Sequence, residues 1–224
     1  MIPLNKIDSA KHVAIVANAE ELLPVGSALY SYLLRLHKKV SFVCCYSVDN
    51  RFSFLPWFEK LRDTLPVSAD LVIELDSSFF TLYDYFKQNS IELNKKMATA
   101  LYASLLVRYD GFVGADADGM VFAQASEIMA CGADYKLCNE FIVKRVTLAR
   151  LRLKSLMLKN MLLKDGAKEA VFYISDIDFV SSGADIKDAE LIMKEALGMQ
   201  YVEKVSLIKS DEKNKILKLI YRER

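Results

Sequence analysis

Two carboxylates and one guanidinium stand where a site could form. Glu21 lies shortly after the apolar run Val13–Val16, and Asp76 directly follows a second apolar run, Leu71–Leu75. Parallel sheets bind their ligands beyond the carboxyl ends of the strands, which is where both acids are expected. The guanidinium is that of Arg108, at the end of a helical run. Because it has donors and no acceptor, it cannot ligate a cation and brings a fixed positive charge instead.

The elements that must position these residues alternate between strand and helix. Apolar runs predict strands at 13–16, 40–45 and 71–76, with helices at about 25–37 and 55–65 between them. Such alternation is typical of a parallel sheet with crossover helices. The predicted fold class is α/β, with helices flanking the sheet.

The rest of the chain is predicted to be helical first and mixed afterwards. Helical periodicity covers 79–88, 95–107, 120–131 and 134–163, followed by a strand at 170–174, a helix at 185–197 and a hairpin of 202–208 with 215–221. The predicted organisation is an α/β domain over 1–132, a helical connector over 133–165, and a small α/β domain over 166–224.

Composition limits the class of protein. Of 224 residues 53% are hydrophobic, and 30 basic residues nearly balance 29 acidic ones. This near-neutral charge produces no strong field that would attract nucleic acid, and it argues against nucleic acid as a partner. No apolar stretch reaches the ~18 residues of a membrane span, and the N-terminus lacks a signal-peptide pattern, so we expect a cytoplasmic protein. Four cysteines without a C-x-x-C pair predict free, packed thiols and no zinc site.

A family resemblance becomes specific over Val13–Tyr30. The segment VAIVANAEELLPVGSALY resembles the opening motif of the DHH/DHHA1 phosphoesterases, above all the oligoribonuclease and phosphoadenosine-phosphate phosphatase branch. The segment from Met97 to Phe112 resembles a later motif of that family. Gly132–Tyr135 and the following helix resemble its connection to the second domain. The resemblance implies a DHH domain, here truncated, and a truncated DHHA1-like domain.

The resemblance also implies a catalytic centre with two divalent metals, and this sequence departs from its ligands. Ala17 stands where the family has a histidine, and Leu23 and Arg108 stand where it has aspartates. Glu21 lies near a further aspartate, and Asp76 corresponds to the one ligand that is retained. Two-metal hydrolysis needs clustered carboxylates and imidazoles. We therefore expect no catalytic residue, no metal ligand and no cofactor.

Two larger departures from the family pattern also indicate a chain without catalytic activity. The Asp-His-His triplet is absent, and Asp76 is followed almost at once by Phe79 and Phe80, as if some dozens of residues were deleted. The Gly-Gly-Gly-His element that holds the nucleic-acid end in the family is also absent. Loss of a strand would expose an edge or an apolar face that needs a cover, such as a rearranged helix, a second copy in a homodimer, or another protein.

Arg108 allows two interpretations of the altered cleft. Gly26 and Ser27 open the first helix in the family pattern, so with Arg108 they could bind an anion such as a nucleotide phosphate. The alternative, which we favour, is an ion pair of Arg108 with Glu21 or Asp76 that fills the place of the metals.

Aromatic side chains are the candidates for a binding surface. They gather in two segments, and the candidates are Phe54, Trp57, Phe58, Phe79, Phe80 and Tyr83. Aromatic residues are enriched at the energetic centres of interfaces, but they also dominate cores. Both interpretations stay open at this point.

The sequence therefore favours a pseudoenzyme that acts through protein–protein contact. An inactive paralogue of the oligoribonuclease in epsilonproteobacteria is similar, and this likeness implies a chaperone or accessory factor of the flagellar stator. Two alternatives are a residual metal-dependent phosphodiesterase acting on short oligoribonucleotides or phosphoadenosine phosphate, and a non-catalytic nucleotide- or RNA-binding protein.

Overall fold

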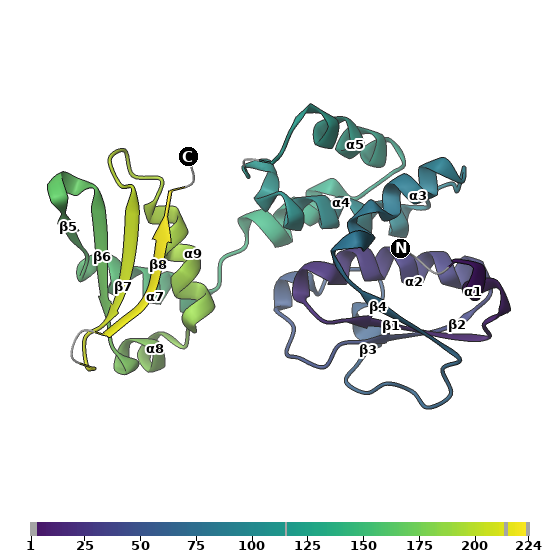
Figure 1. Ribbon diagram of the computed structural model, residues 1–224, viewed down its shortest axis with the longest axis horizontal. Helices are drawn as coiled ribbons and strands as arrows, with labels where there is room; N and C mark the ends of the chain where they lie inside the picture. Colours follow the sequence, from purple (N-terminus) through teal and green to yellow (C-terminus); the bar gives the residue numbers. More distant parts are fainter. Residues whose placement is uncertain (1–3, 115, 213–214, 223–224) are drawn as a thin grey trace. The chain divides into compact units, whose positions relative to one another are not determined.

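Strands and helices alternate through two α/β units, Met1–Arg145 and Val146–Arg224, in the computed structural model (Figure 1). The structure describes residues 4–114, 116–212 and 215–222. The predicted connector, 133–165, contributes helix α6 (Tyr135–Cys138) to the first unit and helix α7 (Leu148–Lys159) to the second.

The first unit is built on a parallel sheet, as the alternating pattern predicted. Its described strands lie in the order β3-β2-β1-β4, and β3 was not predicted. Its strands are β1 (His12–Ala17), β2 (Lys39–Val43), β3 (Leu61–Arg62) and β4 (Leu71–Leu75). Its α-helices are α1 (Leu4–Ser9), α2 (Leu23–Arg35), α3 (Leu82–Gln88), α4 (Lys95–Arg108), α5 (Gly119–Ala130) and α6 (Tyr135–Cys138).

Helix α2 covers one face of this sheet because both surfaces are apolar. Ile15 and Phe42 lie in register on β1 and β2 and are buried with Leu29 and Leu33 of α2. Helix α4 packs on the far side of α2, and α5 packs on α4, so the helices form layers above the sheet (Figure 1).

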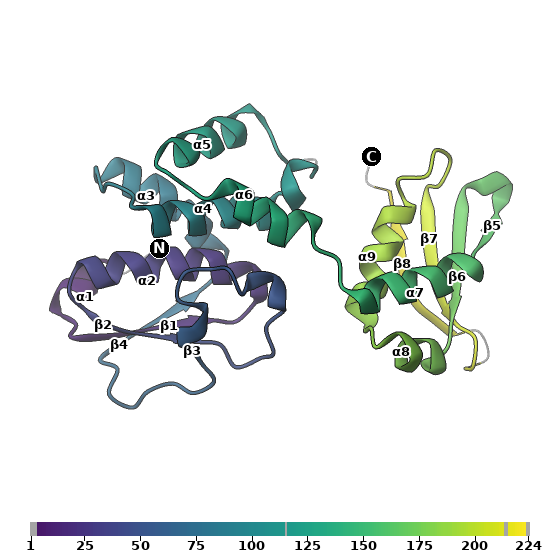
Figure 2. The same ribbon diagram turned by 180° about the vertical axis from the view of Figure 1, so that it is seen from behind.

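The opposite face of the sheet carries no α-helix among the described residues of this unit (Figure 2). Val72 and Glu74 of β4 lie on this face, and Val72 is 40% exposed. Towards the middle of the sheet Ala14 and Val43 are nevertheless buried. This face is therefore incompletely covered within the described residues of the unit.

One predicted helix of this unit is wrong. In place of a helix over 55–65, the chain forms short 3-10 turns at Asn50–Phe52 and Phe58–Lys60 and then enters β3. The reason is Trp57, which has a left-handed backbone with φ of 68°. An L-residue in that conformation ends a right-handed helix.

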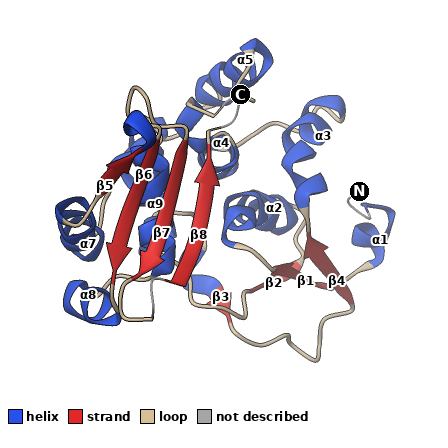
Figure 3. Cartoon of the chain, turned by 60° about the vertical axis from the view of Figure 1, so that its left-hand side comes forward, coloured by secondary structure: helices blue, strands red, loops and turns tan. Residues whose placement is uncertain are grey.

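The second unit has a mixed sheet in the order β5-β6-β7-β8, with helices on one face (Figure 3). Strands β6 and β7 are parallel, whereas β5 pairs antiparallel with β6 and β8 pairs antiparallel with β7. The last pair confirms the predicted hairpin. The elements are α7 (Leu148–Lys159), β5 (Leu162–Lys164), β6 (Glu169–Ile174), α8 (Asp176–Ser182), α9 (Ile186–Ala196), β7 (Lys204–Lys209) and β8 (Lys215–Tyr221). Phe172 of β6 is buried with Leu153 of α7 and Ile192 of α9.

The continuous helix predicted over 134–163 is wrong. Helix α6 continues into a wide π-type turn, Asn139–Lys144, the helical backbone stops at Arg145, and α7 begins afresh at Leu148. The hydroxyl of Thr147 accepts a hydrogen bond from the Arg150 amide, which is the geometry of a helix N-cap. The last residues of the predicted helix form β5 instead.

The cysteines divide into two kinds. All four are free, as predicted, but Cys44 and Cys138 are buried, whereas Cys45 and Cys131 are exposed. Burial raises the pKa of the Cys138 thiol to about 12. The expectation of packed thiols therefore holds for two of the four.

The helices of the described part of the chain are all too short or too polar to cross a membrane.

Candidate functional site

Strands β1 and β4 bring the first candidate residues to one edge of the sheet. Ala17 ends β1 and lies in register with Leu75, the residue before Asp76. The Ala17 side chain is 1% exposed and belongs to the hydrophobic core. The position next to Asp76 therefore offers a methyl group and no donor atom.

Glu21 and Leu23 are separated by the turn that leads into α2. Glu21 lies exposed in a 3-10 turn, Glu20–Leu22, whereas Leu23 begins α2 and is 1% exposed in the core. Only the first of these could reach a ligand.

The Asp76 carboxylate accepts hydrogen bonds within the turn that follows it. Its Oδ1 atom accepts hydrogen bonds from the Ser78 hydroxyl at 2.5 Å and the Ser78 amide at 2.8 Å. These bonds, the hydroxyl first, lower the pKa of the exposed Asp76 carboxyl below its ordinary value. The carboxylate is ionised at neutral pH and stabilises the start of the 3-10 turn Ser77–Thr81.

Arg108 lies at the end of α4 and stacks on aromatic rings. Its guanidinium carbon is 4.9 Å from the ring centroid of Phe80 and 5.4 Å from that of Tyr109. Within the described residues it forms no ion pair with Glu21 or Asp76, so the expected ion pair is wrong. A cation over an aromatic face is the alternative that the fold provides.

Replacing Arg108 by alanine should lower the free energy of unfolding by about 0.5–1 kcal/mol, because an exposed cation–aromatic contact is lost. Urea unfolding measures this change, and Arg108→Lys should recover part of it. Nucleotide titrations of the two variants should match those of the unmodified protein. A selective loss of nucleotide binding in Arg108→Ala would instead revive the anion-binding interpretation.

Gly26 and Ser27 lie inside α2 rather than at its start, because the helix begins at Leu23. Both are buried, and the Ser27 hydroxyl donates to the Pro56 carbonyl. A Cβ atom at Gly26 would lie 2.6 Å from the Phe42 ring and 2.8 Å from a methyl group of Leu75, both in the sheet. Anion binding by Gly26, Ser27 and Arg108 stays a prediction, and this geometry does not favour it.

The residues present do not fit the two divalent ions that the family resemblance implies. Ala17 and Leu23 have no donor atoms, and Arg108 is a cation. Within the described residues, no group of three His, Cys, Asp or Glu side chains is placed to hold a metal ion. A hard divalent ion needs several oxygen or nitrogen ligands together.

A polar cluster beyond β2 was not predicted. Arg51 forms an ion pair with Glu20 at 3.4 Å, and Asp49 accepts a hydrogen bond from the Arg51 amide. The Tyr46 hydroxyl and the Arg51 Nε atom are buried without a hydrogen-bond partner in the described structure. Burial, followed by the thiol of Cys44, raises the pKa of Tyr46. No periodicity marks these residues in the sequence, because they lie in a loop.

The candidate interface aromatics pack inward. Phe54, Trp57, Phe58 and Phe80 are half-buried against the core of the first unit, and Tyr83 is buried in it. The Trp57 indole donates to the Ser31 hydroxyl at 2.8 Å. The side chain of Phe79 lies outside the described residues. The core interpretation therefore fits these residues better than the interface interpretation.

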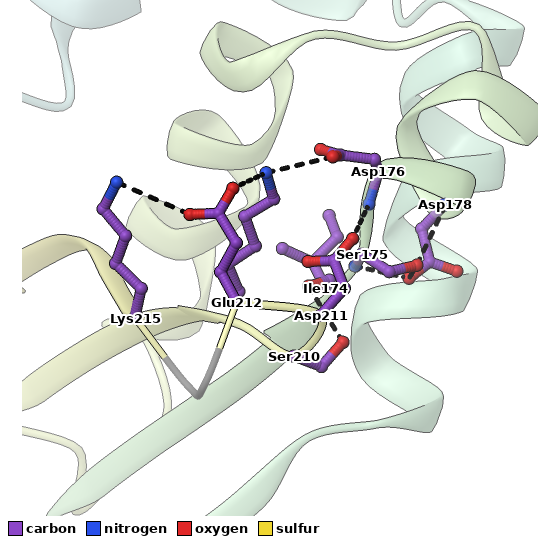
Figure 4. Close-up of polar contacts among 9 residues, drawn as sticks. Ile174, Ser175, Asp176, Asp178, Ser210, Asp211, Glu212 and Lys215 are labelled. Atoms are coloured by element: carbon purple, nitrogen blue, oxygen red, sulfur yellow. Dashed lines mark hydrogen bonds and ion pairs between the residues drawn. The ribbon is translucent and has the colours of Figure 1, made fainter.

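A second polar cluster lies where β6 and β7 end (Figure 4). Ser175 and Asp178 form a reciprocal helix cap, and the Asp211 carboxylate accepts from the Asp176 amide at 3.0 Å. Lys209 pairs with Glu212 at 2.6 Å and with Asp176 at 3.0 Å, and these bonds, Glu212 first, raise its pKa. The charged groups of this cluster satisfy one another, so it is a structural network.

An open cleft of about 430 Å³ lies between α3 and α5. Its lining combines acidic with aromatic and apolar residues, and consists of Tyr83, Asp84, Lys87, Tyr109, Asp116, Asp118, Met120, Val121, Ala123, Gln124 and Glu127. Glu127 accepts from Lys87 and from the Tyr83 hydroxyl, which lowers the pKa of Glu127, with Lys87 as the larger cause. Sequence reasoning missed this cleft because its two walls are far apart in the chain.

Comparison with known proteins supports the fold. An exopolyphosphatase-related protein from Bacteroides fragilis superposes with a TM-score of 0.76 at 13% identity, over 95% of this chain and 80% of that one. A second solved structure, a Methanococcus jannaschii protein described as a putative family II inorganic pyrophosphatase, gives a TM-score of 0.35 at 12% identity, over 88% and 83% of the two chains. Neither a protein-family profile nor a curated protein matches the sequence. The α/β fold of this chain is thus shared with the exopolyphosphatase-related protein.

Proposed function

We propose that this chain is a catalytically inactive phosphoesterase-like protein that acts by binding another protein. The observation that carries the proposal is the pair Ala17 and Leu23, both buried as core residues where the family resemblance places metal ligands. Loss of the side chains that would contact the metal removes its binding, and metal-dependent hydrolysis requires a bound metal. Arg108 adds a positive charge beside the ring of Phe80.

The first test is turnover. The purified chain is incubated with Mn²⁺ and a ribonucleotide dinucleotide, beside an active phosphoesterase as positive control. We expect hydrolysis at the rate of the buffer blank, and the same rate for Asp76→Ala. Hydrolysis that disappears in Asp76→Ala would overturn the proposal and favour a residual phosphodiesterase.

The finer proposal concerns the partner. We propose a chaperone or accessory role at the flagellar stator, and the sequence resemblance to an inactive stator-associated paralogue supports it. In cells that build a flagellar motor, depletion of this chain should lower the amount of assembled stator. The matched comparison is a strain that expresses Asp76→Ala, which should assemble stator normally, since the proposed role needs no catalysis. An unchanged stator level after depletion would contradict this role.

A further inference from the structure

The cleft between α3 and α5 differs in charge from the rest of the molecule. Four carboxylates line it, against the single ammonium group of Lys87, whereas the whole chain carries a formal charge of +1. Lys87 is engaged by Glu127, at 2.7 and 2.9 Å to its two oxygens. Asp118 is engaged too, because its Oδ1 atom accepts from the amides of Met120 and Val121 at the start of α5.

Asp84 and Asp116 are the carboxylates that remain for a ligand. Both are exposed, and neither side chain has a hydrogen bond or ion pair with another described residue. They therefore present negative charge to the cleft without a balancing cation. A cation that enters would gain attraction without breaking an existing pair.

Apolar groups share the cleft with these acids. Met120 is 80% exposed at its rim, and Tyr83, Tyr109 and Val121 line it as well. A flexible thioether adapts to different apolar partners. A ligand that matches the cleft therefore combines positive charge with an aliphatic part.

The chemistry of the cleft narrows the class of ligand. Nucleotides and nucleic acids are repelled by its carboxylates. The described residues contain no group of three His, Cys, Asp or Glu side chains that could hold a divalent metal ion. Lysine and arginine side chains combine a cationic head with an aliphatic stem, and they bury the stem while the head stays hydrated.

We propose that this cleft docks a segment of a partner protein that carries lysine or arginine beside leucine-like residues. The cationic heads meet Asp84 and Asp116, and the aliphatic groups lie on Met120 and Tyr109. The inference deepens the proposed function, on which it rests, by assigning a surface and a partner chemistry to it. The volume of the cleft suits a few side chains of a partner, since sites for small ligands span roughly 300–1,000 Å³.

The probe is a labelled leucine–lysine peptide of about 18 residues, because shorter helices are marginal in water. Its affinity for the full chain is measured by fluorescence anisotropy. We expect the double variant Asp84→Asn/Asp116→Asn to bind about tenfold more weakly. The matched control is Glu59→Gln/Asp63→Asn, two exposed acids of the same unit that do not line the cleft, and it should bind normally.

The site of contact is measured independently by NMR of methyl-labelled methionine. The Met120 methyl signal, assigned with Met120→Leu, should shift on peptide addition. The proposal is overturned if a glutamate-for-lysine peptide binds equally well, if both acid-to-amide pairs weaken binding equally, or if Met120 does not shift. Equal affinity for spermidine or for a serine–lysine peptide overturns the apolar half of the proposal. None of these outcomes depends on the dinucleotide assay, so the two proposals fail separately.

Discussion

Leu23→Asp should lower the free energy of unfolding by about 3–5 kcal/mol. This substitution restores the residue type that the phosphoesterase resemblance places there, yet Leu23 is 1% exposed in the core. The variant loses the packing of a buried leucine and gains a carboxyl group without a partner. Urea unfolding at neutral pH measures the loss.

The controls separate packing from charge. Leu23→Ala should cost about 2–4 kcal/mol from packing alone. A buried carboxyl group has a raised pKa in the folded protein, so the folded state favours its protonated form. The extra cost of Leu23→Asp should therefore shrink as the pH falls towards the ordinary aspartate range.

The effect of Mn²⁺ on the stability of Leu23→Asp tests whether the cleft can still form a metal site. Mn²⁺ should leave the unfolding midpoint of Leu23→Asp unchanged, because Ala17 has no donor atom and Arg108 is a cation. Any ligand that binds the folded state alone raises apparent stability by mass action. A clear rise of the midpoint with Mn²⁺ would mean that the remaining acids still form a metal site, and the inactive-enzyme proposal would fail.

Three of the four described strands of the first unit and their parallel arrangement could be predicted because their signals are local. The runs that became β1, β2 and β4 are short and apolar. Buried parallel strands have this pattern. In the second unit β6, α9 and the hairpin of β7 and β8 were predicted from equally local patterns. Strand β5 and helix α8 were missed, the latter despite its Ser175–Asp178 cap.

The errors have tertiary causes. The helix over 55–65 fails at Trp57, whose left-handed backbone accompanies packing of its ring against Tyr30, with centroids 5.3 Å apart. The partner of Arg108 could not be predicted either. It depends on how the end of α4 lies beside Phe80, a residue 28 positions earlier. Periodicity carries no information on such contacts.

The candidate site shows the same division. Burial of Ala17 and Leu23 follows from their apolar side chains, so the loss of metal ligands was visible in the sequence. The cleft between α3 and α5 was not visible, because Asp84 and Asp116 acquire a joint role only when two distant helices form its walls. Residue type predicts what a position can do chemically, and the fold decides which positions act together.

Gly26 is the glycine of this chain at which an added Cβ atom would meet the closest neighbours. A Cβ atom there would lie 2.6 Å from Phe42 Cζ and 2.8 Å from Leu75 Cδ1. Both contacted residues are 2% exposed, so the rings and methyl groups around them have little space to move. The absence of a side chain lets α2 approach the sheet closely, and this explains the glycine without any bound phosphate.

Gly26→Val should therefore lower the free energy of unfolding by about 3 kcal/mol, the upper part of the range for added methylene groups in a packed core. Gly119→Val is the matched control. It also lies in the first turns of a helix, but a Cβ atom there meets nothing within 4 Å, so it should change stability by about 0.5 kcal/mol or less. Urea unfolding measures both. Pairing Gly26→Val with Phe42→Leu should recover part of the loss, because the shorter side chain vacates the space that the valine needs. Equal stability of the two single variants would show that the contact of α2 with the sheet is looser than these distances indicate.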